Sequence, residues 1–150
     1  MSLSRSPDGQ AVSLGGLTDL LGYHLRMAQV AMYRDFAAHL AEMNLTQKQA
    51  ATMQLIAANE GICQIDIGAT LGTDRSTMLA LVDRLQRRGL LTRRQSRAVG
   101  RRQELYLTPK GEATLARANT LIRQHERKFT ERFSAAELAT LFDALKRIHL

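Results

Sequence analysis

The chain has 150 residues, 45% of them apolar, and a formal net charge of +7, which fits one globular domain with a packed core and a polyanionic partner. The single cysteine excludes an intrachain disulfide framework, and no stretch reaches the roughly 20 apolar residues of a membrane span. The first residues lack the compact apolar run of a secretory signal, so we expect a cytoplasmic protein.

The positive charge is concentrated between Arg75 and Lys110. That segment holds ten basic residues against two acidic ones, Asp83 and Glu104, for a local net charge of +8. The rest of the chain has 11 basic and 12 acidic residues and a net charge of −1. A nucleic-acid interface is therefore expected in this one segment.

The N-terminal part divides into an arm and a long helix. Residues 1–16 combine one proline, three glycines and four serines, which predicts a flexible arm. From Leu17 onward apolar residues recur at steps of three and four, so an amphipathic helix is predicted to about Glu42. The chain from residue 17 to residue 150 is expected to form a single domain.

Two shorter helices follow. Thr46 with Gln49 is typical of a capping box, and the helix it opens carries one apolar face and ends near 59–61. That face consists of Ala50, Met53, Ile56 and Ala57. A short helix is predicted over 64–71, ended by Gly72.

The next helix, capped by Asp74 and ended by Gly89, has two distinct faces when its residues are spaced about 100° apart. One face is apolar and predicted to be core: Met78, Leu81, Val82 and Leu85. The other is small, polar and mostly cationic: Ser76, Thr77, Ala80, Asp83, Arg84 and Arg87.

A hairpin and two more helices complete the chain. Strands are predicted over 91–95 and 103–107, and the connection between them contains Gly100 and several arginines. Thr108 followed by Pro109 is typical of a helix start, and so is a capping box at Ser134. The total is about six helices and one short hairpin.

This order of elements indicates a winged helix-turn-helix that binds double-stranded DNA. The outer face of a recognition helix reads base edges in the major groove, a role we predict for Arg75, Ser76, Thr77, Ala80 and Arg84. Arginines on a thin hairpin suit the narrow minor groove, a role we predict for Arg97 and Arg101. Phosphate contacts that set register are predicted for Arg87, Arg93, Arg94, Arg102 and Lys110.

Several motifs resemble those of the multiple-antibiotic-resistance regulator (MarR) family. They are Asp-Arg-Ser-Thr at 74–77, Arg-Leu-Gln-Arg-Arg-Gly-Leu at 84–90, Gly-Arg-Arg at 100–102 and Leu-Thr-Pro-Lys-Gly at 107–111. The specific motifs lie between 62 and 111, and the element order is similar from 17 to 150. The resemblance implies a mainly α fold, with a winged helix-turn-helix over 46–111 between dimerisation helices over 17–45 and 112–150.

It further implies a homodimer on a near-palindromic operator, acting as a transcription regulator. Most such proteins are repressors, often released by small aromatic or phenolic ligands, and none of the residues identifies the ligand here. Dimerisation is expected through the apolar stripes of the first and last helices: Leu17, Leu21, Leu25, Leu138, Leu141, Phe142, Leu145 and Ile148.

The sequence departs from the family pattern at three places. Gly100 stands where the family usually has an aspartate that braces the wing, so we expect a looser tip. Leu79 and Ala80 occupy positions that are often polar, which favours apolar contact with thymine methyl groups. Gly68 lies within a predicted helix, at a cost of up to about 1 kcal/mol relative to alanine.

Other interpretations remain open at this level. The basic segment could be a solvated surface, and the leucine stripes could be core within one chain. A winged-helix protein that binds RNA or another protein is the main alternative function, although only 5% of the residues are aromatic and could stack on bases. A small-molecule-binding protein that has lost DNA binding is a third, which the intact positive face disfavours.

No enzyme, cofactor or metal site is expected. The sequence has no nucleophile motif, phosphate-binding glycine loop or cluster of metal ligands at a recognised spacing. His24 and His39 lie about 22 Å apart on one predicted helix and cannot share an ion within a chain. Cys63 begins the helix-turn-helix without an evident base nearby, which favours a structural or exposed thiol over a redox sensor.

Overall fold

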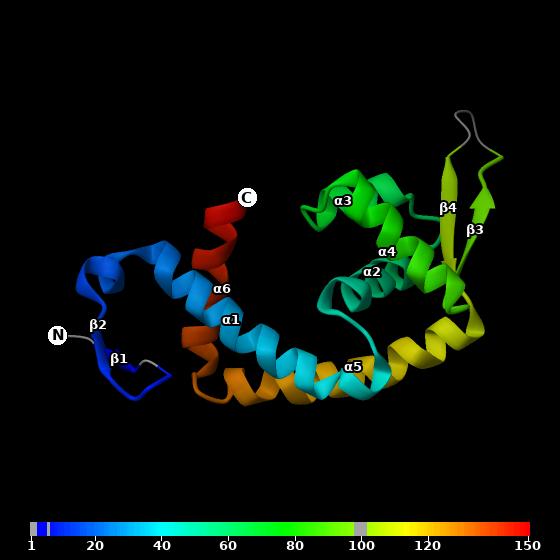
Figure 1. The fold of residues 1–150 in the computed structure, drawn as a ribbon. Coiled ribbons are helices and arrows are strands. Elements are labelled where there is room, and N and C mark those ends of the chain that lie inside the picture. Colours follow the sequence, from blue (N-terminus) through cyan, green and yellow to red (C-terminus); the bar gives the residue numbers. More distant parts are fainter. Residues whose placement is uncertain (1–2, 6, 98–101) are drawn as a thin grey trace. The chain divides into compact units, whose positions relative to one another are not determined.

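The computed structural model describes residues 3–5, 7–97 and 102–150 (Figure 1). Its α-helices are α1 (Leu21–His39), α2 (Gln47–Ala58), α3 (Gln64–Thr70), α4 (Arg75–Arg87), α5 (Pro109–Thr130) and α6 (Ala135–His149). Its strands are β1 (Leu3–Arg5), β2 (Ala11–Ser13), β3 (Leu91–Gln95) and β4 (Gln103–Leu107), and two short 3-10 helices are η1 (Gly15–Asp19) and η2 (Ala41–Met43). This is the predicted mainly α architecture, a winged helix-turn-helix with flanking helices.

The chain divides into two units, residues 1–35 and 36–150, and the boundary lies inside the continuous helix α1. Within the described ranges, no helix has both the length and the apolar character needed to cross a bilayer.

The first unit differs from the sequence prediction in two ways. Where a flexible arm was expected, β1 and β2 pair as an antiparallel hairpin with Leu3 opposite Ser13. The long helix begins at Leu21 rather than Leu17, because the chain first makes η1 and then extends at Leu20 (φ −98°, ψ 122°). The apolar steps of three and four continue through this interruption, so periodicity alone does not reveal it.

In the second unit, the core forms around α2, α4 and the first half of α5. Met53, Ile56, Val82, Leu85 and Ala118 are all at most 1% exposed. Ala57, predicted to share the apolar face of α2, is exposed instead. The buried side of α2 instead includes two polar residues, Gln49 and Thr52.

All four predicted helix caps are confirmed. The Thr46 and Ser134 side chains each accept from the backbone N–H three residues on, and Gln49 and Glu137 return the contact to complete two capping boxes. The Thr108 hydroxyl likewise caps α5, with Pro109 in its first turn. The Asp74 carboxylate caps α4 by accepting from the Thr77 backbone N–H.

The wing is an antiparallel pair in which Leu91 faces Leu107 and Gln95 faces Gln103. The other edge of β4 also carries a short partner: Gly61 donates to the Leu105 carbonyl, Leu105 donates to the Ile62 carbonyl, and Cys63 bridges to Glu104. The wing is thereby tied to the start of α3, which the sequence prediction did not include. Figure 1 shows β3 and β4 standing beside α4.

Candidate nucleic-acid interface

Helix α4 has the two faces that its sequence predicts. Met78, Leu81, Val82 and Leu85 are buried, each at most 8% exposed. The five residues predicted to read bases are all exposed: Arg75, Ser76, Thr77, Ala80 and Arg84. Leu79 is also half exposed, so the surface beside Ala80 is apolar. This face therefore offers both cationic donors and small or apolar groups at the helix start.

Asp74 organises the first turn of α4. Its carboxylate accepts from the Thr77 backbone N–H at 2.9 Å, the Thr77 hydroxyl at 2.6 Å and the Ser76 hydroxyl at 2.7 Å. These contacts, led by the Thr77 hydroxyl, hold the pKa of Asp74 far below its ordinary value of 3.8. Both hydroxyl protons are engaged by Asp74, which leaves the oxygens of Ser76 and Thr77 as acceptors on the outer face.

We predict that α4 loses stability in acid because Asp74 titrates. Its pKa is lowered in the folded chain, so its stabilisation is complete above the unfolded value of 3.8 and is lost as pH falls toward the folded pKa. Asp74→Asn keeps a good capping residue but cannot titrate. Thermal melts from neutral pH to about pH 3 should show the wild type losing a few degrees more than this variant. A melting-temperature difference that stays constant with pH would contradict the assignment.

Arg93 braces the wing against α4. Its guanidinium pairs with Asp83 at 2.5 Å and donates to Gln86 Oε1 at 2.7 Å, and its side chain is only 18% exposed. Arg93 was predicted to contact phosphate, whereas in the structure its guanidinium faces α4. Arg93 is therefore positioned to fix the angle between β3 and α4.

Arg94, the next residue of β3, lies on the other side of the wing. Its guanidinium sits over the ring of Tyr106, 4.5 Å from the ring centre. The Tyr106 hydroxyl donates to Glu104, and this hydrogen bond raises the pKa of the tyrosine. Arg94 remains exposed, so the ring orients a side chain that can still reach a phosphate.

Two other basic residues, Arg88 and Lys110, make hydrogen bonds at the C-terminal end of α4. Arg88 donates to the carbonyl oxygens of Met43 and Asn44, and Lys110 donates to the Arg88 carbonyl at 2.9 Å. Lys110, a predicted phosphate contact, thus helps to satisfy the C-terminal carbonyls of the helix while two of its ammonium protons stay available. Arg87 is exposed on the last turn of α4, as its predicted role requires.

The tip of the wing is described in part. Ser96 donates to the Arg102 carbonyl, which continues the hairpin beyond the two strands, and Arg97 and Arg102 are exposed. Arg101 and Gly100 lie outside the described residues, so the predicted minor-groove role of Arg101 stays a prediction.

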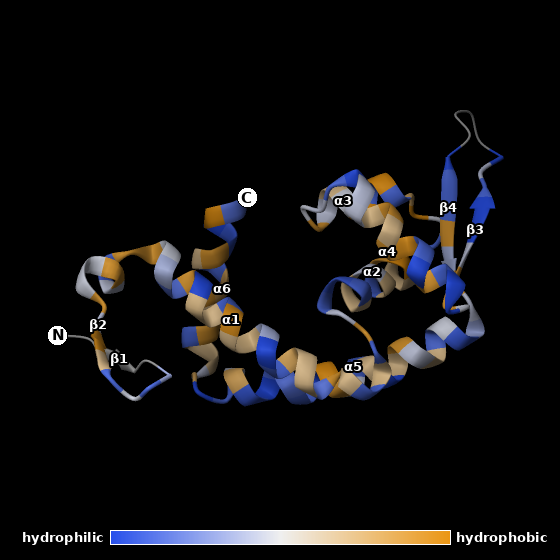
Figure 2. Ribbon diagram, viewed as in Figure 1, coloured by the Kyte–Doolittle hydropathy of each residue, from blue (hydrophilic) through white to orange (hydrophobic). Residues whose placement is uncertain are grey.

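The residues predicted to form a dimer are largely exposed within a single chain. Helix α6 buries none of its residues, although Figure 2 shows apolar positions recurring along it. Phe142 is 51% exposed and Ile148 is 52% exposed, while Leu138 and Leu145 are partly covered. In the first unit, Leu17 and Leu21 are 45% and 61% exposed and Leu25 is half-buried.

Three supporting residues escaped the sequence analysis. Asp83 was assigned only to the outer face of α4 and Gln86 only to a family motif, and their link to Arg93 depends on the strand register. Gly111 was identified only as part of a family motif. The structure gives a physical reason for glycine there, because an added Cβ would lie 1.9 Å from the Leu90 carbonyl oxygen. The spacing of Arg93 from Asp83 could have suggested a pair between helix and strand.

Comparison with known proteins decides the family. A model of the MarR family matches residues 43–102. A putative transcriptional regulatory protein for the hcr operon of Thauera aromatica is 34% identical over 136 residues, covering 90% of this chain and 82% of the relative. The chain belongs to the MarR family. It is accordingly a transcriptional regulator of the MarR type.

Solved MarR-family structures share this fold over nearly the whole chain. The repressor CouR bound to a 23-mer DNA duplex is 37% identical with a TM-score of 0.88, covering 94% of this chain and 100% of that one. CouR bound to p-coumaroyl-CoA is 38% identical with a TM-score of 0.83, covering 91% and 96%. The MarR-family resemblance of the motifs at 74–111 is thus confirmed, as is the winged helix-turn-helix that it implies.

Proposed function

We propose that this chain is a homodimeric, sequence-specific repressor of a near-palindromic operator. Each protomer places the outer face of α4 in the major groove and its wing beside the minor groove. A small aromatic ligand releases the protein from DNA. It acts by binding rather than by catalysis, in the bacterial cytoplasm.

The observation that carries this proposal is the fixed relation between α4 and the wing. The exposed residues of α4 between Arg75 and Arg87 lie beside a hairpin in which Arg93 pairs with Asp83 and donates to Gln86. Base reading needs this geometry, because a recognition helix and a wing that moved independently would not hold one register on the duplex. The DNA-bound relative CouR supports the same use of the fold.

Selection from a random duplex library tests the proposal. The full chain should recover a two-fold-symmetric consensus with half-sites about one helical turn apart, and its affinity should fall steeply with salt. Weak, uniform binding without a consensus would remove the claim of specific recognition. Structured RNA that displaces the protein from its best duplex at equal mass would favour an RNA-binding winged helix instead.

We expect Arg75→Ala and Arg87→Ala to have different effects on DNA binding. Loss of a base-reading arginine should weaken operator binding by about 1–3 kcal/mol and relax the preference at one base pair of each half-site. Loss of a phosphate contact should weaken operator and unrelated DNA by a similar factor and reduce the salt slope by about 1 for each contact removed. Equilibrium binding to operator and scrambled duplexes at several salt concentrations measures both.

Arg123→Ala is the matched charge control, because Arg123 is exposed on α5 outside the basic segment. It should leave both affinities nearly unchanged. If Arg75→Ala kept the operator affinity and base preference of the wild type, α4 would not be the reading element.

The ligand can be approached through the relative bound to p-coumaroyl-CoA. We infer that an aromatic acid or its thioester releases this chain from its operator. Titrating the protein–operator complex separately with p-coumaroyl-CoA, p-coumarate and coenzyme A distinguishes the contribution of the aromatic group to release from that of the nucleotide part. Release by coenzyme A alone would show that the aromatic group is not what is recognised.

A further inference from the structure

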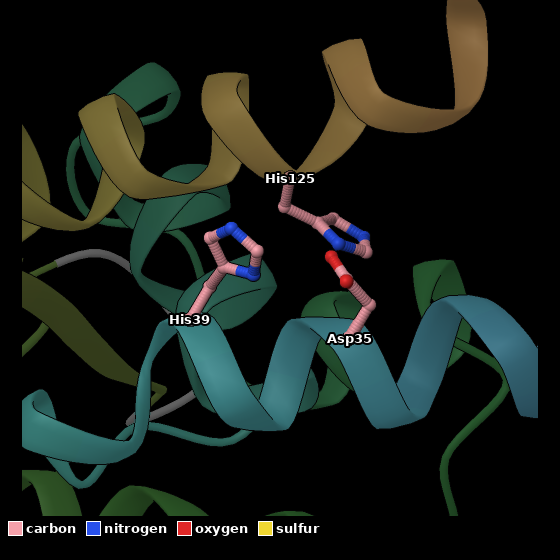
Figure 3. A group of neighbouring side chains, drawn as sticks. All are labelled: Asp35, His39 and His125. Atoms are coloured by element: carbon pink, nitrogen blue, oxygen red, sulfur yellow. The ribbon is translucent and has the colours of Figure 1, made fainter.

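Three side chains able to bind a metal lie together near the end of α1. Asp35 and His39 are one helical turn apart on α1, and His125 lies on α5. One ligand atom of each lies within 4.8 Å of the others. Figure 3 shows Asp35 and His39 leaving the same face of α1, with His125 pointing toward them from α5. Asp35 keeps its helical relation to His39 although the boundary between the two units falls directly after it.

Aromatic side chains enclose the buried member of this cluster. His125 is fully buried, and its ring contacts Phe36 and Phe129 edge to face, with ring centres 5.5 and 5.2 Å apart. The His39 ring lies 6.0 Å from that of His125. Asp35 and His39 are half-buried. Partial burial strengthens the attraction between a cation and its ligands relative to water.

The donor set fits a divalent transition metal. Two imidazoles and one carboxylate are ligands that Zn²⁺ accepts, and ligands at positions i and i+4 on one helix face can share an ion. Tetrahedral ligands at about 2.0–2.2 Å from Zn²⁺ lie roughly 3.4 Å from one another. Donor atoms up to 4.8 Å apart must therefore approach by up to about 1.4 Å, which side-chain rotation can supply.

We propose that Asp35, His39 and His125 form a binding site for one divalent transition-metal ion per chain, with Zn²⁺ the best match. The three residues leave a fourth tetrahedral position for water. A bound ion would link the last turns of α1 to α5 and stabilise the folded chain by mass action. The site was not predicted from the sequence because His125 is distant along the chain from Asp35 and His39, and the three do not form a short ligand motif.

Cobalt titration of the untagged, chelator-treated full chain tests the proposal. Co²⁺ should give visible d–d absorption that saturates at one equivalent per chain, and Zn²⁺ should displace it. Asp35→Asn and His39→Gln should each weaken binding by at least about 10-fold, because each removes a ligand. Zn²⁺ should raise the melting temperature of the wild type and have a smaller effect on either variant.

His24→Gln is the matched control, since His24 is exposed on the same helix and contacts the Thr18 carbonyl instead. It should bind Co²⁺ as the wild type does. Substitution at His125 is avoided because that side chain is fully buried, and circular dichroism would check that the two ligand variants fold. Absence of saturable binding near one equivalent, or equal binding by the wild type and both ligand variants, would overturn the site.

Discussion

Gly111→Ala is expected to destabilise the protein severely, although alanine is the better helix former. Gly111 is buried in the first turn of α5, and a Cβ there would lie 1.9 Å from the Leu90 carbonyl oxygen and 2.9 Å from its carbonyl carbon. Leu90 is 1% exposed and cannot move away alone, because its carbonyl also accepts from the Thr108 backbone N–H. The clash should outweigh the roughly 1 kcal/mol gained in helix propensity.

We expect a net loss of about 2–4 kcal/mol and a fall in melting temperature of roughly 10 °C or more. Thermal and urea unfolding measure it, and operator binding should fall too because α5 and the wing meet at this contact. Gly22→Ala is the control: Gly22 lies in α1 with nothing within 4 Å of an added Cβ, so alanine should be neutral or slightly stabilising. If both variants melted alike, the close approach at Leu90 would not be a real constraint.

Local signals in the sequence predicted the elements well. Thr46, Asp74, Thr108 and Ser134 mark helix starts because a capping side chain needs only a backbone N–H three residues away. The start of α1 was missed because apolar spacing persists through η1. The β1–β2 hairpin was missed because its short strands lack alternating polarity, and turn-forming residues dominate that segment.

The exposure of residues on α4 was easier to predict from the sequence than the contacts that hold α4 in place. The helical wheel placed Thr77, Arg84 and Arg87 outward because the period of one helix determines which residues share a face. The partners of Arg93, and the approach of Gly111 to Leu90, depend on how separate elements pack. Arg93 was predicted to contact DNA because it lies in the basic segment, whereas in the folded chain its guanidinium forms an ion pair with the Asp83 carboxylate.

The double variant Leu141→Glu/Phe142→Glu is expected to convert a dimer into a monomer. In one chain these side chains are 39% and 51% exposed on a well-capped helix that buries none of its residues. A stripe of this kind costs free energy in water unless another surface covers it. A second copy of the chain offers the same apolar stripe, and two-fold symmetry lets the two stripes cover each other. Two carboxylates placed there would be desolvated without partners, so association should fail.

Light scattering after size exclusion should report twice the chain mass for the wild type and a single mass for the variant at micromolar concentration. Operator affinity should fall by more than about 100-fold, because two half-sites no longer bind as one unit. Thr140→Glu on the polar side of α6 is the control and should remain dimeric and bind operator. A double variant that kept the dimer mass would place the interface elsewhere. A monomer with undiminished operator affinity would instead separate dimerisation from DNA recognition.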